Sequence, residues 1–141
     1  MRFFDIFKKK KATLTKAQSE YDSKYDRVKK LCDLHAEGKL ASPYAELLVF
    51  QGQVENGGHY QYFDNLKETG NLHTQMSALE QILPPKFMEN LKKAYEAYLV
   101  LQENPDNETA ENITTQTDDW FYTNEEEIDR ILMEHYASIG I

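Results

Sequence analysis

The sequence predicts an all-α fold, a single compact domain of about six helices with short connections and one longer acidic loop. Apolar residues recur at three- and four-residue steps along most of the chain, and alternation at period two never lasts more than a few residues. Glycine and proline separate the periodic segments. With 141 residues, 40% of them apolar, the chain is long enough to bury a core without a disulfide or a structural metal.

The first 14 residues are predicted to be a basic and apolar arm that precedes one helical domain over residues 15–141. The arm contains an apolar cluster, Phe3 to Phe7, followed by the lysine run Lys8–Lys11. It fits either a frayed arm packed on the domain or a contact with an anionic membrane surface. The cluster is too short for a signal sequence, and no segment approaches the ~20 apolar residues of a membrane span. We therefore expect a cytoplasmic protein with no stable membrane insertion.

The first two helices are predicted from their start and stop residues. Apolar periodicity predicts a helix over Lys16–Glu37, which Gly38 ends. A second helix is predicted over Ser42–Glu55, with Ser42 as the N-cap and Pro43 in the first helical position. Asn56-Gly57-Gly58 should end this helix in a tight turn, because glycine adopts positive φ without steric cost.

The remaining helices follow the same periodicity. The segment from Asn104 to Thr117 is polar and without clear periodicity, which predicts a long, mobile acidic loop. Trp120-Phe121-Tyr122 should anchor the chain back onto the core, ahead of a capping box at Thr123-x-x-Glu126. The predicted elements are helices over His59–Lys67, Leu72–Leu83 and Lys86–Glu103, and a last helix that runs from this capping box through Tyr136.

Charge is distributed unevenly along the chain, whose net charge is −8. Residues 1–30 sum to +6, residues 31–102 to −4 and residues 103–141 to −10. The acidic end is either a solvated surface that keeps the protein soluble or a surface that meets a basic partner. A domain of this net charge repels polyanions, so direct binding to nucleic acid is not expected. The candidate partner-binding residues are Glu111, Asp118, Asp119, Glu125, Glu126, Glu127, Asp129 and Glu134.

The patterns that signal catalysis or metal binding are missing. The single cysteine, Cys32, excludes a disulfide within the chain and makes a thiolate zinc site improbable. No two of the four histidines have a zinc-binding spacing, and no phosphate loop or nucleophile elbow occurs. We therefore expect no cofactor, no metal, no catalytic residue and no enzymatic activity.

One segment resembles a known family. Residues 54–65 resemble the signature of a bacterial family of small acidic helical proteins, mostly uncharacterised, that is named after a DNA-mimic protein, and the resemblance covers about residues 20–137. It implies an all-α fold and, as in the namesake, a dimer whose carboxylates imitate DNA phosphates on a DNA-binding protein. The matching residues, which we call the signature, are Glu55, Asn56, Gly57, Gly58, Gln61, Tyr62, Phe63 and Asn65.

We expect the signature to be structural. The two glycines permit a sharp helix–helix corner, and Glu55 and Asn56 can accept hydrogen bonds from backbone amides exposed there. Tyr62 and Phe63 should be core anchors.

Three functions remain open from the sequence. The first is a non-enzymatic acidic protein that mimics DNA and occupies the basic site of a DNA-binding protein such as a transcription regulator. The second is an immunity or antitoxin-like partner of a toxic protein. The third is an enzyme with a pocket near Glu55, His59 and Tyr62, which a packed corner at these residues would argue against. A homodimer is compatible with each.

Overall fold

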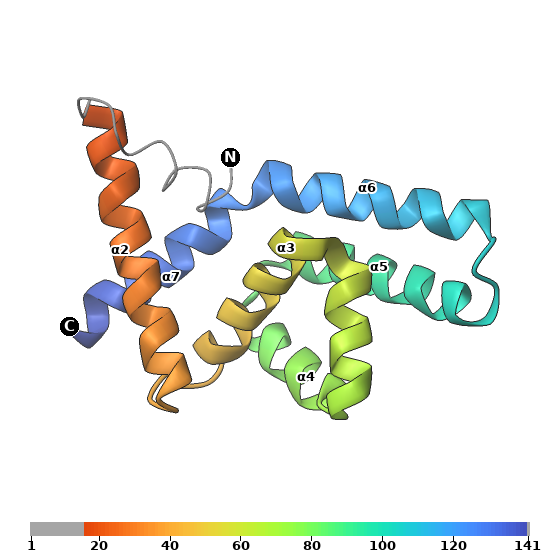
Figure 1. Ribbon diagram of the computed structural model, residues 1–141, viewed down its shortest axis with the longest axis horizontal. Helices are drawn as coiled ribbons and strands as arrows, with labels where there is room; N and C mark the ends of the chain where they lie inside the picture. The colour runs from red at the N-terminus through yellow and green to blue at the C-terminus, as the bar shows by residue number, and fades with distance from the viewer. Residues whose placement is uncertain (1–15, 141) are drawn as a thin grey trace. The chain divides into compact units, whose positions relative to one another are not determined.

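The computed structural model describes residues 16–140, which form six helices and contain no strand (Figure 1). This confirms the all-α class. The basic and apolar arm predicted over residues 1–14 lies outside the described residues. The helices are α2 (Lys16–Ala36), α3 (Tyr44–Thr69), α4 (Leu72–Ile82), α5 (Pro85–Glu103), α6 (Glu108–Asn124) and α7 (Glu126–Ile139).

The helices belong to two compact units. The first contains the described residues up to Leu40 and those from Arg130 onward, which are α2 and most of α7. Within it, the Arg27 guanidinium lies 5.7 Å from the centre of the Tyr136 ring, and the Lys30 ammonium lies 3.5 Å from the Tyr136 hydroxyl. Gly38 follows α2 with φ +71°, and its N–H donates to the His35 carbonyl, as expected for the predicted stop.

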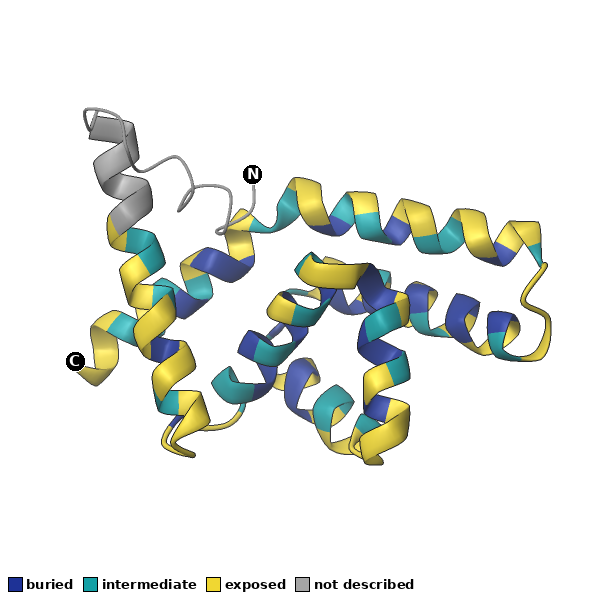
Figure 2. Cartoon of the chain, in the orientation of Figure 1, coloured by how far each residue is buried: buried dark blue, intermediate teal, exposed yellow. Residues whose placement is uncertain are grey.

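The second unit, Ala41–Asp129, contains α3 to α6 and the start of α7 around an aromatic core. Phe50, Tyr62, Phe63 and Phe121 are at most 1% exposed. The Phe50 ring meets Tyr62 and Phe121 edge to face, with ring centres 5.2 and 5.5 Å apart. This is the favoured geometry for aromatic pairs. In α6 the buried residues lie on the side that faces α5 (Figure 2).

The two helices predicted on either side of Asn56-Gly57-Gly58 are the two arms of α3. The backbone leaves helical geometry at Gly58, where φ is +80° and ψ is 178°. The turn is tight enough for the hydrogen-bonding pattern to continue from one arm into the other, so the predicted corner is present without a loop. The first arm of α3 begins at Tyr44. The Ser42 hydroxyl donates to the Glu46 carboxylate instead of capping the helix as predicted.

The long acidic loop predicted over Asn104–Thr117 is wrong, because α6 begins at Glu108. Asn107 caps this helix, and its side-chain oxygen accepts from the Ala110 N–H at 2.9 Å. Glu108 and Glu111 in the first turn also favour the positive end of the helix dipole. In the part of α6 that the sequence predicts as a loop, the buried residues are Ala110 and Thr117, which are small or polar.

The predicted capping box at the last helix does not form. Thr123 lies inside α6, and its hydroxyl donates to the Asp119 carbonyl four residues earlier. Only Glu125 separates α6 from α7, and it keeps right-handed helical geometry. The two helices therefore follow each other almost without a connection.

Candidate functional site

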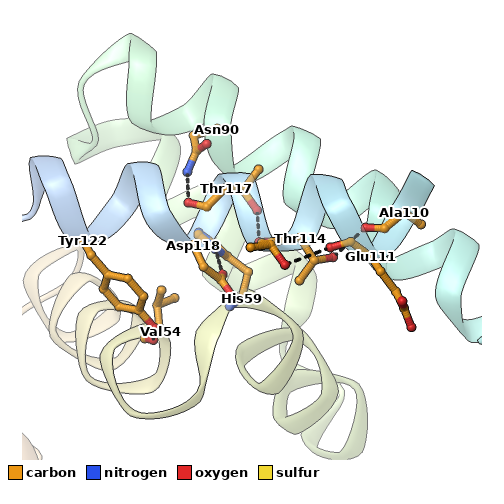
Figure 3. Close-up of polar contacts among 10 residues, drawn as sticks. Val54, His59, Asn90, Ala110, Glu111, Thr114, Thr117, Asp118 and Tyr122 are labelled. Carbon is orange, nitrogen blue, oxygen red and sulfur yellow. Dashed lines mark hydrogen bonds and ion pairs between the residues drawn. The ribbon is translucent and has the colours of Figure 1, made fainter. Parts of the chain in front are cut away.

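The signature forms a sharp corner that an acid from a distant helix holds in place (Figure 3). At Gly58 the chain adopts a φ and ψ combination that is essentially restricted to glycine. The Asp118 carboxylate of α6 lies directly against this residue: a Cβ built on Gly58 would be 2.5 Å from Asp118 Oδ2. Gly58 is thus required both by backbone geometry and by the close approach of α6.

Asp118 accepts two hydrogen bonds from the residue that follows the corner. Its Oδ1 accepts from the His59 backbone N–H at 2.9 Å and lies 2.7 Å from His59 Nδ1. The His59 ring is 1% exposed and packs between Phe50 and Phe121, with ring centres about 6 Å away. Its Nε2 is buried with no hydrogen-bond partner among the described residues. The backbone N–H at the corner therefore donates to an acid of α6, and not to Glu55 or Asn56 as the sequence predicted.

The remaining signature side chains also contact the protein itself. The Tyr62 hydroxyl donates to Gln75 Oε1 at 3.2 Å, and burial raises the pKa of Tyr62. The Gln61 and Asn65 amides both donate to Gln53 Oε1, at 3.2 and 2.6 Å. Phe63 is in the aromatic core, whereas Asn56 is exposed. These contacts stabilise the two arms of α3, which agrees with the structural role expected for the signature.

A second polar cluster joins α3 to the junction of α6 and α7. The Gln51 amide, itself buried, donates to Asp129 Oδ1 at 2.6 Å and to Glu125 Oε2 at 3.2 Å. Glu125 also shares a hydrogen bond with Glu55 of the signature. Burial, this hydrogen bond and the nearby charges of Glu55 and Asp129 raise the pKa of Glu125 from 4.5 to about 8. The cluster therefore retains a proton near neutral pH.

The raised pKa of Glu125 predicts a pH-dependent stability. Below pH 4.5 the proton is bound in both the folded and the unfolded chain, and the stability that it contributes is fully present. This contribution is lost as the pH rises through about 8, where the folded protein must release the proton. We expect Glu125→Gln to be more stable than the wild type by about 1–2 kcal/mol at about pH 9, a value discounted for partial exposure, and nearly equal to it at acid pH.

Urea denaturation across this pH range measures the effect. Glu126→Gln is the matched control, because Glu126 is the next residue and is exposed. Its stability should follow that of the wild type at every pH. Parallel pH profiles for Glu125→Gln and the wild type would show that the proton is not held in this cluster.

The eight candidate partner-binding acids fall into two groups. Asp118, Glu125 and Asp129 point toward the protein: Asp118 holds the corner, Glu125 is half-buried and Asp129 is only 8% exposed. Their carboxyl groups are engaged in hydrogen bonds within the protein. The exposed members are Glu111 and Asp119 on α6 and Glu126, Glu127 and Glu134 on α7.

Further acids are exposed next to those of α6. Glu103, Asp106 and Glu108 are exposed at the end of α5, in the connection and at the start of α6. Glu108 and Asp119 are separated by three helical turns and lie on the same face of α6, about 16 Å apart along its axis. The sequence interpretation as a mobile loop left this ordered face undetected, although the Asn107 cap and the two acids after it signalled a helix.

The side chains of His59 and Tyr62 are packed inside the corner. His59 and Tyr62 are at most 1% exposed. A groove of about 730 Å³ lies between α5 and α6, and none of Glu55, His59 and Tyr62 lines it. In the part of the chain that the structure describes, no three His, Cys, Asp or Glu residues are placed to hold a metal ion. None of the described helices has the length and apolar composition needed to cross a membrane.

Comparison with known proteins identifies the family but no individual relative. None of the curated proteins and none of the solved structures matches the chain. The model of one family, described as DMP19-like protein, matches residues 43–139. The match covers all of α3 to α7, including the signature corner and the acid that holds it. The chain therefore belongs to the DMP19-like protein family.

Proposed function

We propose that this chain is a non-enzymatic acidic binding protein that occupies the basic surface of a DNA-binding protein by mimicking DNA. One observation carries the proposal: the 36 residues from Ala94 to Asp129 contain eleven acids and no lysine, arginine or histidine. Most of this segment belongs to α6 and to the helix ends beside it, which fix its carboxylates in space. Membership of the DMP19-like protein family supports the same reading.

The mimicry of DNA depends on how closely the density of exposed carboxylates on α6 approaches the density of phosphates on DNA. Glu108, Glu111 and Asp119 are exposed along about 16 Å of helix, a length over which one DNA strand presents about five phosphates. The negative electrostatic field of α6 is therefore weaker than that of DNA. The acids beside the helix strengthen it. Binding through such a surface should weaken as salt increases, because salt screens exposed charges.

Affinity capture from a lysate of the native cell at about 50 mM and about 300 mM salt tests the proposal. A captured basic protein, identified by mass spectrometry, should be released by salt and also by added duplex DNA. The triple variant Glu108→Gln, Glu111→Gln, Asp119→Asn should retain about tenfold less of it, a loss of about 1.4 kcal/mol spread over three charges.

A matched variant removes three charges from outside the acidic segment. Asp33→Asn, Glu68→Gln, Glu80→Gln neutralises three exposed acids of α2, α3 and α4 and, like the triple variant, changes the net charge from −8 to −5. It should capture the partner as well as the wild type does. If both variants lost the captured partner equally, the loss would come from the change in net charge and not from the position of the acids. If duplex DNA failed to displace the partner, the mimicry of DNA would be refuted.

A further inference from the structure

The groove between α5 and α6 is apolar along its floor. It is lined there by Ala97 and Val100 of α5 and by Ala110, Ile113 and Trp120 of α6. Ala97 and Ala110 are buried and pack together with Leu101, and Ile113 packs against this cluster. Because alanine is small, the two helices leave a hollow above their contact. We call it the α5/α6 groove.

The groove has the length and shape for another helix. From Thr109 to Trp120 it follows twelve residues of α6, or about 16 Å along the helix axis. This equals about three turns of an α-helix, and the hollow between two packed helices is where a third helix places its ridge of side chains. At one end the Asn90 amide donates to the Thr117 carbonyl at 3.0 Å and joins the two helices (Figure 3).

The apolar floor is partly open to solvent. Val100 is 42% exposed, and Trp120 and Ile113 are half-buried. The Phe87 ring covers one side of Trp120, with ring centres 4.8 Å apart, and leaves the indole among the groove residues. Covering this floor with an apolar face would remove it from water, which favours binding.

The charges around the groove select a positive occupant. Glu96 lines it, and Glu103 and Asp106 are exposed close to Val100 and Asn107, which line the groove at its end near the α5–α6 connection. Lys93 is the only base among the lining residues, and its ammonium lies 3.8 Å from the Glu89 carboxylate one turn away. An occupant with lysine or arginine on the side next to Glu96 and Glu103 would therefore meet opposite charges along α5.

We propose that the α5/α6 groove binds an amphipathic helix of the partner, whose apolar ridge covers Val100, Ile113 and Trp120 and whose basic edge faces Glu96 and Glu103 of α5. The inference rests on the proposed function, because it assigns the partner's basic surface a helical element. It adds that the affinity of the chain for its partner has two contributions. One is electrostatic and weakens with salt, and the other is an apolar contact that salt does not weaken.

A synthetic helix supplies the probe. A fluorescein-labelled peptide of about 16 residues contains only leucine and lysine, with leucine at helix positions i, i+3, i+4 and i+7. It is titrated with the full-length chain and followed by fluorescence anisotropy. Trp120 is the only tryptophan of the protein. An unlabelled peptide should therefore shift its emission along the same binding curve.

Two adjacent residues give a matched pair of variants. Val100 and Leu99 are similarly exposed on α5, at 42% and 46%, but only Val100 lines the groove. Val100→Ser should weaken binding of the peptide by about three- to fivefold, because about half of an apolar side chain is lost from the contact. Leu99→Ser should bind as the wild type does. Both positions are exposed, so neither change should unfold the protein.

Several results would overturn the inference. These are equal affinities of the Val100→Ser and Leu99→Ser variants, binding that leaves Trp120 emission unchanged, and equally tight binding of a peptide with glutamate in place of lysine. A change in sedimentation of the Val100→Ser variant alone would assign the groove to a second copy of the chain, and also overturns it.

The two proposals fail separately. If the triple charge variant loses the captured partner but Val100→Ser and Leu99→Ser retain it equally, the groove inference is wrong and the proposed function stands. If duplex DNA does not displace the captured protein while the peptide result holds, the groove binds a basic helix and DNA mimicry fails.

Discussion

Replacing Gly58 with alanine is expected to lower the free energy of unfolding by about 3–5 kcal/mol. Alanine is strained at φ +80° and ψ 178°, and its Cβ would be 2.5 Å from Asp118 Oδ2. Relief requires that the Asp118 carboxylate move away, which weakens both hydrogen bonds from His59 to Asp118. Urea denaturation of the variant, followed by far-UV circular dichroism, measures the loss.

Gly52 provides the control on the same helix. It lies in the first arm of α3 without positive φ, and a Cβ there would meet nothing within 4 Å. Gly52→Ala should therefore stabilise the protein by about 0.5–1 kcal/mol, because alanine is the better helix former. If Gly58→Ala were also neutral or stabilising, the corner would not depend on glycine and the assignment of Asp118 as its support would be wrong.

Replacing Asp118 with alanine is expected to cost about 2–4 kcal/mol. The variant leaves the backbone N–H and the Nδ1 of His59 without their acceptor, in a place where the ring is 1% exposed. Buried groups that lose a charged partner are among the costliest polar deletions. Thermal and urea denaturation at neutral pH give the value.

The neighbouring acid separates this effect from loss of charge. Asp119 is exposed, so Asp119→Ala should change the free energy of unfolding by no more than about 0.5 kcal/mol. Asp118→Asn should recover part of the stability, since the amide oxygen can still accept from the His59 N–H. If Asp118→Ala and Asp119→Ala were equally mild, Asp118 would be available to a partner after all.

Local signals in the sequence were sufficient for most of the helices. Gly38 ends α2 as predicted, and Pro85 stands in the first position of α5, where its missing N–H costs nothing. The Asn56-Gly57-Gly58 turn was placed correctly because the conformational freedom of glycine is a property of the residue itself. Such features need no knowledge of what packs against them.

The missed features depend on contacts between distant segments. α6 buries Ala110 and Thr117 against α5, and neither residue is apolar enough to reveal a buried face in the sequence. Asp118 was grouped with the partner-binding acids because its formal charge is the same as that of Asp119. Only the packing of α6 on the corner distinguishes a carboxylate that accepts from His59 from one that is exposed.

The hydrogen bond from His59 to Asp118 joins residues 59 positions apart in the chain. The backbone hydrogen bonds within each arm of α3 are local, so each arm can become helical early, on the timescale of helix formation. The bend between them is fixed only when α6 has formed and closed this long loop, and closure of long loops is what slows folding. We therefore expect α3 to acquire its secondary structure early and its final course late, in the same step that brings the acidic helix onto the core.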